Sequence, residues 1–425
     1  MQKNFYKGFR MLLEFSCSNH KSIKETISFS MIAGKDNTFE DKLLQYDKYR
    51  VLRSSVVYGA NGSGKSNFID AVAFTRNLVL NSIKHQPGDG IRQQLHQLSK
   101  SDDISQYAMQ FTKNNIRYSY GFTLKNSLVI DEYMFYFPKG RKIVIFERND
   151  KDFVSGDKFK GRFETCRDVL KPNRLFLSCA ANFSSVQEVL DAFSFFKDDL
   201  IIYRGVGTDN WLNYSLNVIE QNSNVKKAVL DLFNRLGTGI KDINIKHSKQ
   251  NLDPNSLPPF LADDFKLALL NNKFDVYETK IVYEKFSIDL NSESTGIKKL
   301  IEFVCPLLDI INKDKILFCD EIESNLHESI VNGLVNLFRG NNISSQSQII
   351  FTTHDTTLLD LDLFRRDQIW FTELTFDNRA TDLYSLAEIK NVRKDENIAK
   401  GYILGKYGAI PMLNSDLSVK ILNGE

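Results

Sequence analysis

The chain has 425 residues, of which 42% are hydrophobic, so it is long enough for two or three domains or lobes around packed cores. Its formal net charge of +2 excludes a chain-wide basic field for nucleic acid or a membrane surface, although it is compatible with a local basic patch. Five scattered cysteines without a C-x-x-C pair, and the lack of an apolar run of about 18 residues, argue against disulfide-framework, zinc-site and transmembrane classes and favour a cytoplasmic protein.

The N-terminal region predicts a strand pair. Residues 1–10 include basic residues but lack the apolar core and cleavage site of a signal peptide, and Met11 is a second candidate start of the chain. Apolar and polar residues alternate from Leu12 to Phe29 on both sides of "SNHKS", which indicates a hairpin or two strands.

The stretch "VVYGANGSGKSNFIDAV", Val56 to Val72, joins a β-branched run to an apolar helical pattern through a glycine-rich turn. It satisfies G-x-x-x-x-G-K-[ST], in which backbone amides and a helix N-terminus hold phosphate, the lysine reaches the β/γ-phosphates and the hydroxyl binds Mg²⁺. A chance match in a glycine-containing turn is the alternative, and the strand before and the helix from Ser66 to about Ser82 argue against it. The expected nucleotide-binding residues here are Gly59, Asn61, Gly62, Ser63, Gly64, Lys65, Ser66 and Asn67.

The next segments predict an antiparallel sheet, and after it the sequence pattern changes to helical periodicity. "YAMQFTKNNIRYSYGFTL" and "VIDEYMFYF" are rich in β-branched and aromatic residues, with "KNN" as a turn. From about 150 to 285, "SSVQEVLDAFSFFKDDL" and "SNVKKAVLDLFNRLG" have helical periodicity, and "SKQNLDPNSLPPF" indicates a surface loop. We expect a mainly helical insertion here, with ordinary scaffold as the alternative.

Buried-type strands then return in "KILFCDE", "QIIFTTH" and "DQIWFTE", and "ESIVNGLVNLFRG" has helical spacing. Such strands with intervening helices predict a largely parallel sheet that is covered on both faces.

Two polar positions follow these strands. Asp320 and Glu321 come directly after Ile316 to Cys319, at the strand end where α/β folds bind ligands. Asp320 suits coordination of Mg²⁺, and Glu321 suits polarisation of the water that attacks the γ-phosphate; two acids that open a loop are the alternative. His354 in "IIFTTHD" suits contact with the γ-phosphate or orientation of that water, against a strand-end histidine without a role.

A Ser-rich turn precedes the apolar helix in "SESTGIKKLIEFV". Ser294, Thr295 and Gly296 would present hydroxyls and amides at the helix N-terminus, which is an anion-binding arrangement, and a plain N-cap is the alternative.

Together and in this order, these elements resemble the ABC-type ATPase head of SMC and RecF proteins. The Ser294 turn, 26 residues before Asp320, resembles the family's signature turn, although "STG" departs from Leu-Ser-Gly-Gly. "SNHKS" resembles the family's Asn-Phe-Arg-Ser turn, which implies that Asn19 and Lys21 lie near the nucleotide, and "SNLHE" occupies the place of the D-loop. No Q-loop glutamine is assigned.

The resemblance implies an α/β fold: an ABC-type P-loop ATPase head with a largely parallel sheet, an antiparallel β subdomain and a mainly helical insertion. The expected segments are an ATPase lobe over 1–150, the insertion over 151–285, a second ATPase lobe over 286–385, and a family-specific segment over 386–425.

A narrower resemblance is to the bacterial RloA/AbiLi type of ATPase, and the PARIS defence ATPase is similar. It is carried by "YRVLRSSVVYGANGSGKSN", "NSESTGIKKL", "DEIESNLH", "FTTHDTTLLD", "RRDQIWF" and "GYILGKYGAIP", the last of which lies outside any generic ATPase core. It implies ATP and Mg²⁺ as cofactors, a homo-oligomer through ATP-sandwiched heads, and a neighbouring-gene effector, such as a TOPRIM-type nuclease, in phage defence or abortive infection.

Four functions remain open from the sequence. The first is an ATPase that senses a trigger and regulates an effector, and the second is a RecF-like ATPase of DNA repair or maintenance. A transporter subunit is disfavoured by the long insertion and the absence of a membrane segment. A self-contained nuclease is disfavoured because only about 60 residues follow "DLD" at Asp360 to Asp362, too few for a TOPRIM domain.

Overall fold

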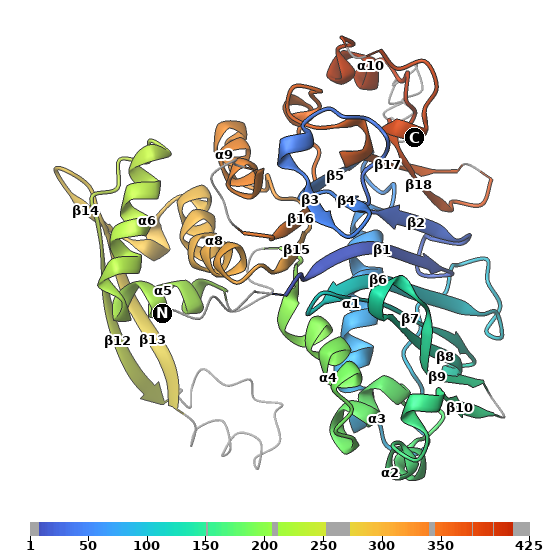
Figure 1. Cartoon of the computed structure of the whole chain (residues 1–425). Coiled ribbons are helices and arrows are strands. Elements are labelled where there is room, and N and C mark those ends of the chain that lie inside the picture. Colours follow the sequence, from blue (N-terminus) through green and yellow to red (C-terminus); the bar gives the residue numbers. More distant parts are fainter. Residues whose placement is uncertain are drawn as a thin grey trace, which may run out of the picture. The chain divides into compact units, whose positions relative to one another are not determined.

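The computed structural model describes residues 8–149, 152–205, 211–251, 273–339, 345–375, 377–393 and 395–410. It forms two compact units (Figure 1): Met1–Arg204 with Lys313–Glu323 and Leu334–Glu425, and Gly205–Asn312 with Ser324–Gly333. Most of the predicted loop "SKQNLDPNSLPPF", from residue 252, and the C-terminal residues from 411 lie outside the described residues.

An antiparallel sheet of seven strands forms one half of the first unit. In sheet order the strands are β10 (Phe153–Ser155), β9 (Ile143–Asn149), β8 (Leu128–Phe137), β7 (Ile116–Lys125), β6 (Ser105–Lys113), β1 (Met11–Ser18) and β2 (Ile27–Ser30). The predicted strand pair and antiparallel sheet are confirmed, and both belong to one sheet because β1 pairs with β2 on one side and β6 on the other. A separate hairpin joins β3 (Leu44–Tyr46) to β4 (Tyr49–Val51).

A six-stranded sheet lies in the same unit and contains β5, the strand that precedes the glycine-rich turn. Its order is β11 (Leu200–Tyr203), β15 (Ile316–Cys319), β16 (Gln348–Thr352), β5 (Ser54–Gly59), β17 (Ile369–Leu374) and β18 (Thr381–Ser385). Every pairing is parallel except that of β17 with β18. All residues of β5, β15 and β16 are buried, as continuous apolar strands between covering layers require, so the predicted largely parallel sheet is confirmed.

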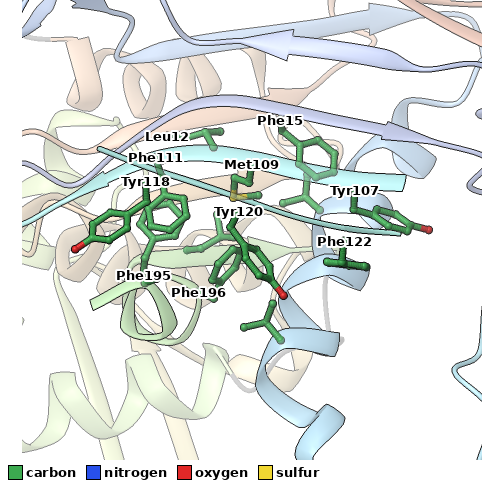
Figure 2. Packing of buried hydrophobic residues seen from close by; sticks show 14 of the residues in the cluster. Leu12, Phe15, Tyr107, Met109, Phe111, Tyr118, Tyr120, Phe122, Phe195 and Phe196 are labelled. Carbon is green, nitrogen blue, oxygen red and sulfur yellow. The ribbon is translucent and has the colours of Figure 1, made fainter. Parts of the chain in front are cut away.

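Aromatic packing joins the antiparallel sheet to the segment that follows it in the chain. Figure 2 shows Phe195 and Phe196 beside Phe111 and Tyr120 of the sheet. The Phe111 and Phe195 rings stack with centroids 4.0 Å apart, and Phe196 meets Phe111 edge-on at 5.5 Å. The structure therefore groups residues up to Arg204 with the first unit, whereas the sequence predicted a separate insertion over 151–285. The helices of this unit are α1 (Lys65–Asn81), α2 (Glu164–Val169), α3 (Phe176–Phe183), α4 (Gln187–Ser194) and α10 (Ile398–Ile403).

The second unit contains helices and a small sheet around its own core. Its helices are α5 (Trp211–Gln221), α6 (Ser223–Arg235) and α8 (Thr295–Asn312), and its strands are β12 (Asp242–Asn251), β13 (Lys273–Val282) and β14 (Ser287–Asp289). The sheet was not predicted, and residues 248–251 of the predicted loop belong to β12. The helix α9 (Glu328–Arg339) has residues in both units. No helix in the described part of the chain is long and apolar enough to cross a membrane.

Candidate nucleotide-binding site

The phosphate loop connects the end of β5 to the start of α1, and two of its glycines are required by packing. A Cβ on Gly59 would lie 2.4 Å from Oγ1 of Thr372, and a Cβ on Gly64 would lie 2.0 Å from Oγ1 of Thr381. Gly62, with φ of 79°, has nothing within 4 Å of its Cβ position. The loop is thus held against β17 and β18 on one side and open at Gly62, where a ligand can approach backbone amides closely.

Lys65, the first residue of α1, is buried, and its ammonium group contacts the loop itself. Its Nζ donates to the carbonyl oxygens of Gly59 at 2.8 Å and Ala60 at 3.1 Å, and lies 3.5 Å from Nδ1 of His354. Burial lowers the pKa of the Lys65 amine to about 8, against the opposite effect of three nearby carboxylates. An anion beside this amine would stabilise its charged form, so the lysine fits a phosphate group.

Thr352, at the end of β16, organises the two acids that follow β15. Its hydroxyl donates to Oδ1 of Asp320 at 2.6 Å and accepts from the backbone N–H of Glu321 at 2.7 Å. Glu321 has φ of 46°, in the left-handed region, and its side chain is exposed. A non-glycine residue in this region is held there by its surroundings, and such positions cluster at functional sites. The sequence analysis missed Thr352, although its place at the end of a predicted strand, two residues before His354, was visible.

Glu323 is a third acid that the sequence analysis did not select. Its Oε1 accepts the backbone N–H of His354 at 2.6 Å, while its Oε2 is buried and has no hydrogen-bond partner among the described residues. Partial burial, together with the charge of Lys65, lowers the pKa of His354, so its imidazole is neutral near pH 7. The spacing "DEIE" was the available signal for Glu323.

The ligand set at this site fits Mg²⁺ bound together with a phosphate. Ser66 is exposed at the start of α1, and Asp320 supplies a carboxylate at the end of β15. Among the described residues, no group of three His, Cys, Asp or Glu side chains could hold a metal without other ligands. Mg²⁺ usually takes one or two protein oxygens and completes its shell with water and substrate phosphate, which this arrangement permits.

The remaining polar residues of the loop connect it to its neighbours. Asn67 donates through Nδ2 to Oγ of Ser22 at 2.6 Å, and that hydroxyl lies 2.7 Å from Oγ1 of Thr381. The Ser63 hydroxyl lies 2.7 Å from Oγ1 of Thr372. Asn61 is exposed at the loop tip. These contacts therefore fix the loop to β17, to β18 and to the segment that contains Ser22.

Asn19 is buried and holds the loop over residues 96–104. Its Oδ1 accepts from the backbone N–H of His96 at 2.9 Å and from Oγ of Ser99 at 2.7 Å, and its Nδ2 donates to the carbonyl of Ile104 at 2.9 Å. These contacts are structural, and among the described residues the hydrogen bonds of its side chain go to this loop and not to the phosphate loop. A place for Asn19 beside a nucleotide stays a prediction.

Lys21 pairs with a residue of the helix that follows the phosphate loop. Its Nζ lies 2.7 Å from Oδ2 of Asp70, to which Nε2 of the buried His20 also approaches at 3.1 Å. Lys21 lines a pocket of about 380 Å³ together with Gly62 and Asn67. The structure therefore brings Lys21 and the phosphate loop to the same pocket.

The Ser294 turn lies in the second unit, and Ser294 caps the N-terminus of α8. The Ser294 hydroxyl accepts from the backbone N–H of Ile297 at 3.3 Å, and Thr295 donates through Oγ1 to Oδ1 of Asn325 at 3.4 Å. A Cβ on Gly296 would lie 2.7 Å from the carbonyl oxygen of Asn325, which explains the glycine. The N-cap alternative is thus present, and a role of this turn toward nucleotide stays a prediction.

Comparison with known proteins gives a family and a set of similar folds. The model of the AAA_21 family, described as "AAA domain, putative AbiEii toxin, Type IV TA system", matches residues 54–360, which include the phosphate loop, Asp320 and His354. Among curated proteins, none matches the sequence.

The solved structures that are similar include three SMC heads. One is an SmcHead bound to the C-winged helix domain of ScpA, at 12% identity and a TM-score of 0.43, with 88% of this chain and 97% of that chain covered. Another is the SMC head domain from Thermotoga maritima, at 13% and 0.38, with 88% and 98% covered. The third is an Smc head domain with an extended coiled coil bound to the C-terminal domain of ScpA, from Pyrococcus furiosus, at 10% and 0.40, with 89% and 96% covered.

Proposed function

The chain belongs to the AAA_21 family, and on that premise we propose that it binds ATP with Mg²⁺, hydrolyses it, and thereby regulates a partner effector in defence against phage. The observation that supports ATP binding most directly is the position of the Lys65 amine. This amine is buried and donates to two carbonyl oxygens of its own loop, and the charges of three nearby carboxylates act to raise its pKa. A buried cation in such a loop is the arrangement that phosphate binding uses.

Lys65 and the loop amides would hold the phosphate groups. On binding, the Lys65 amine exchanges the carbonyls of Gly59 and Ala60 for phosphate oxygens, and loop N–H groups donate on the open side at Gly62. Ser66 and Asp320 would hold Mg²⁺, which when bound offsets the charge of the phosphates.

Glu321 is the proposed general base. Its carboxylate is exposed while its backbone is fixed by the Thr352 hydroxyl, so it can accept a proton from the attacking water. His354 is neutral near pH 7 and can donate to a phosphate oxygen or orient that water, and its backbone is fixed by Glu323.

We further propose that two heads associate around ATP, with the phosphate site of one protomer facing the Ser294, Thr295 and Gly296 turn of the other. The exposed side chain of Ser294, at the N-terminus of an 18-residue helix, supports this, because amides and hydroxyls there favour an anion.

The effector is proposed to be a separate protein, a nuclease by class, that is encoded beside this chain. The toxin–antitoxin description of the family and the resemblance to RloA/AbiLi-type ATPases support a defence role. The second candidate is a RecF-like ATPase of DNA repair, which would show DNA-stimulated hydrolysis with a steep dependence on salt.

Titration calorimetry with ATP and Mg²⁺ tests the first step on wild type, Lys65→Ala and the matched control Lys160→Ala, whose lysine is a surface residue with 73% of its side chain exposed. Lys65→Ala should lose detectable binding, because the phosphates lose their main cation, and Lys160→Ala should bind like wild type. Equal affinity for Lys65→Ala and wild type would show that the phosphate-loop assignment is wrong.

A further inference from the structure

The C-terminal segment Gly401–Ile410, which we call the C-terminal brace, contacts Ala60 of the phosphate loop. The carbonyl oxygen of Ala409 accepts the backbone N–H of Ala60 at 2.9 Å. This is the described part of "GYILGKYGAIP", the motif that a generic ATPase core does not include. The contact joins positions that are nearly 350 residues apart in the chain.

Side chains of three elements hold the backbone around Ala409 in place. The Tyr402 hydroxyl donates to the same carbonyl at 3.0 Å, and the Ala409 N–H donates to Oε1 of Glu373 at 3.2 Å. The Tyr384 hydroxyl donates to the neighbouring carbonyl of Tyr407 at 2.8 Å. Ala409 has φ of 58°, which an alanine adopts only where its surroundings impose it.

The glycines of the motif are explained by this packing. A Cβ on Gly408, with φ of 73°, would lie 2.7 Å from the Tyr384 hydroxyl and 2.9 Å from Oε2 of Glu373. A Cβ on Gly401 would lie 2.6 Å from the Tyr407 hydroxyl. The glycines of the motif therefore permit the close packing that holds Ala409 where its carbonyl accepts the hydrogen bond from Ala60.

Ala60 is also the residue on which Lys65 rests. Its carbonyl accepts from the Lys65 amine at 3.1 Å and from the backbone N–H of Ser63 at 3.1 Å, while its N–H is taken by Ala409. The Ala60 N–H is therefore used to fix the loop and is not free for phosphate. Ala60, Asn61 and Ser63 share the lining of a 270 Å³ pocket with Ala409 and Ile410, so the brace borders the loop over more than one contact.

We propose that the C-terminal brace positions the phosphate loop for nucleotide, with Ala409 as a positioning residue that acts through Ala60, an inference that rests on the proposed ATP binding. ATP affinity and the placement of the brace are then coupled in both directions, because each stabilises the same loop conformation. Displacement of the brace should weaken ATP binding without any change to a residue that touches ATP.

Four variants test this with ATP and Mg²⁺: Tyr402→Phe, Gly408→Ala, Lys65→Ala and the control Leu404→Ala, whose side chain is 73% exposed in the same segment. Loss of the Tyr402 hydrogen bond should raise the calorimetric Kd roughly fivefold, as for one neutral hydrogen bond. The clash and left-handed strain in Gly408→Ala should raise it about tenfold or more. Leu404→Ala should bind like wild type.

Hydrogen exchange without nucleotide distinguishes a positioning role from a general contribution to stability, because only a positioning role predicts faster exchange confined to the phosphate loop. In Tyr402→Phe, amides of residues 60–66 should exchange faster than in wild type, while amides of the antiparallel sheet should not. In steady state, KM for ATP should rise more than kcat falls.

The outcomes separate the two levels of inference. If Lys65→Ala loses ATP binding but Tyr402→Phe matches wild type in Kd and in hydrogen exchange over residues 60–66, the proposed role of the brace is wrong and the proposed ATP binding stands. If Lys65→Ala binds like wild type, the proposed function fails and the brace with it. Should Gly408→Ala fail to fold, Tyr402→Phe decides alone, because it removes one oxygen from a side chain that otherwise keeps its shape.

Discussion

The Thr352 hydroxyl lies between two acids with different proposed tasks. It donates to Asp320 and accepts from the N–H of Glu321, so one side chain fixes a carboxylate for the metal and the backbone beside the base. Glu323 fixes the backbone of His354 from the other side. Each proposed reacting group is thus positioned by a residue that the sequence analysis did not select as functional.

Glu321→Gln should separate binding from hydrolysis. The amide keeps the size of the side chain and removes its ability to take a proton, so we expect ATP binding to remain and hydrolysis to fall roughly a hundredfold or more. Phosphate release, measured beside calorimetric binding, checks both. Normal hydrolysis in Glu321→Gln would place the base elsewhere.

Glu323→Gln and Glu323→Ala should differ because only the first keeps an acceptor for the His354 N–H. We expect Glu323→Ala to have a kcat about tenfold below that of Glu323→Gln, since the loss of an acceptor leaves a donor unpaired. Phosphate release at saturating ATP measures this ratio. Equal kcat values for the two variants would show that the contact does not position His354.

Asp70→Asn should remove a pH-dependent contribution to stability. Burial would raise the Asp70 pKa, but hydrogen bonds and charges from His20 and Lys21 outweigh it and hold the pKa well below its usual range. A depressed carboxyl pKa stabilises the fold above the unfolded pKa of about 3.9, and the gain is lost as the pH falls toward the folded value.

The measurement is the free energy of unfolding in urea for wild type, Asp70→Asn and the exposed control Asp102→Asn, at pH 7 and pH 3. Asp70→Asn should be less stable than wild type by roughly 1–2 kcal/mol at pH 7, and the gap should shrink at pH 3. A gap of the same size at both pH values would contradict the charge-based account.

Among the elements, the three strand ends of β5, β15 and β16 determine the site. Their parallel pairing places the phosphate loop, Asp320 and Thr352 at the same edge of the sheet. The N-terminus of α8 is the other element with a proposed role, and its contacts with Asn325 decide which substitution can test that role. Gly296 is unsuitable, because any side chain there would meet the backbone of Asn325.

Ser294→Asp and Ser294→Asn offer a matched pair at the start of α8. Both residues are good N-caps, so both should preserve the helix, but only aspartate adds a negative charge opposite the proposed γ-phosphate. In a Glu321→Gln background, ATP should drive association with Ser294→Asn and at least about tenfold weaker association with Ser294→Asp. Light scattering with crosslinking near Ser294 measures this. Equal ATP-driven association of the two variants would contradict the composite site.

At the scale of the whole molecule, the residues proposed to act on ATP belong to two different units. The phosphate loop, the three acids and His354 are in the first unit, and the Ser294 turn is in the second. An ATP-dependent contact between two copies would therefore involve both units, and an effector could respond to that contact without binding ATP itself.

Defence against phage should require a second protein. Expression of the chain alone and with its neighbouring gene, followed by phage challenge, should give protection only for the pair, and Lys65→Ala in the pair should lose it. Full protection by this chain alone would contradict the effector proposal. DNA-stimulated hydrolysis without protection would instead favour a RecF-like ATPase of DNA repair.

The sequence by itself determined the elements whose signals are local. Apolar runs predicted β5, β15 and β16, and the spacing of Gly59, Gly64 and Lys65 predicted the loop, because a strand end, a tight turn and a helix start each depend on a few adjacent residues. Asp320, Glu321 and His354 could be selected for the same reason: each lies within two residues of the end of such a strand.

Only the tertiary structure decided the contacts between distant segments. β11 joins the parallel sheet, Thr352 bridges both acids, Glu323 reaches His354, and Ala409 fixes Ala60. Thr352, Glu323 and Ala409 lie in quoted motifs, but their partners lie far away in the chain. These contacts arise because the fold closes long loops and removes water around the polar groups that then must pair. The local sequence indicated the segments in which these residues lie, but their partners are set by packing between distant segments, which a local pattern does not specify.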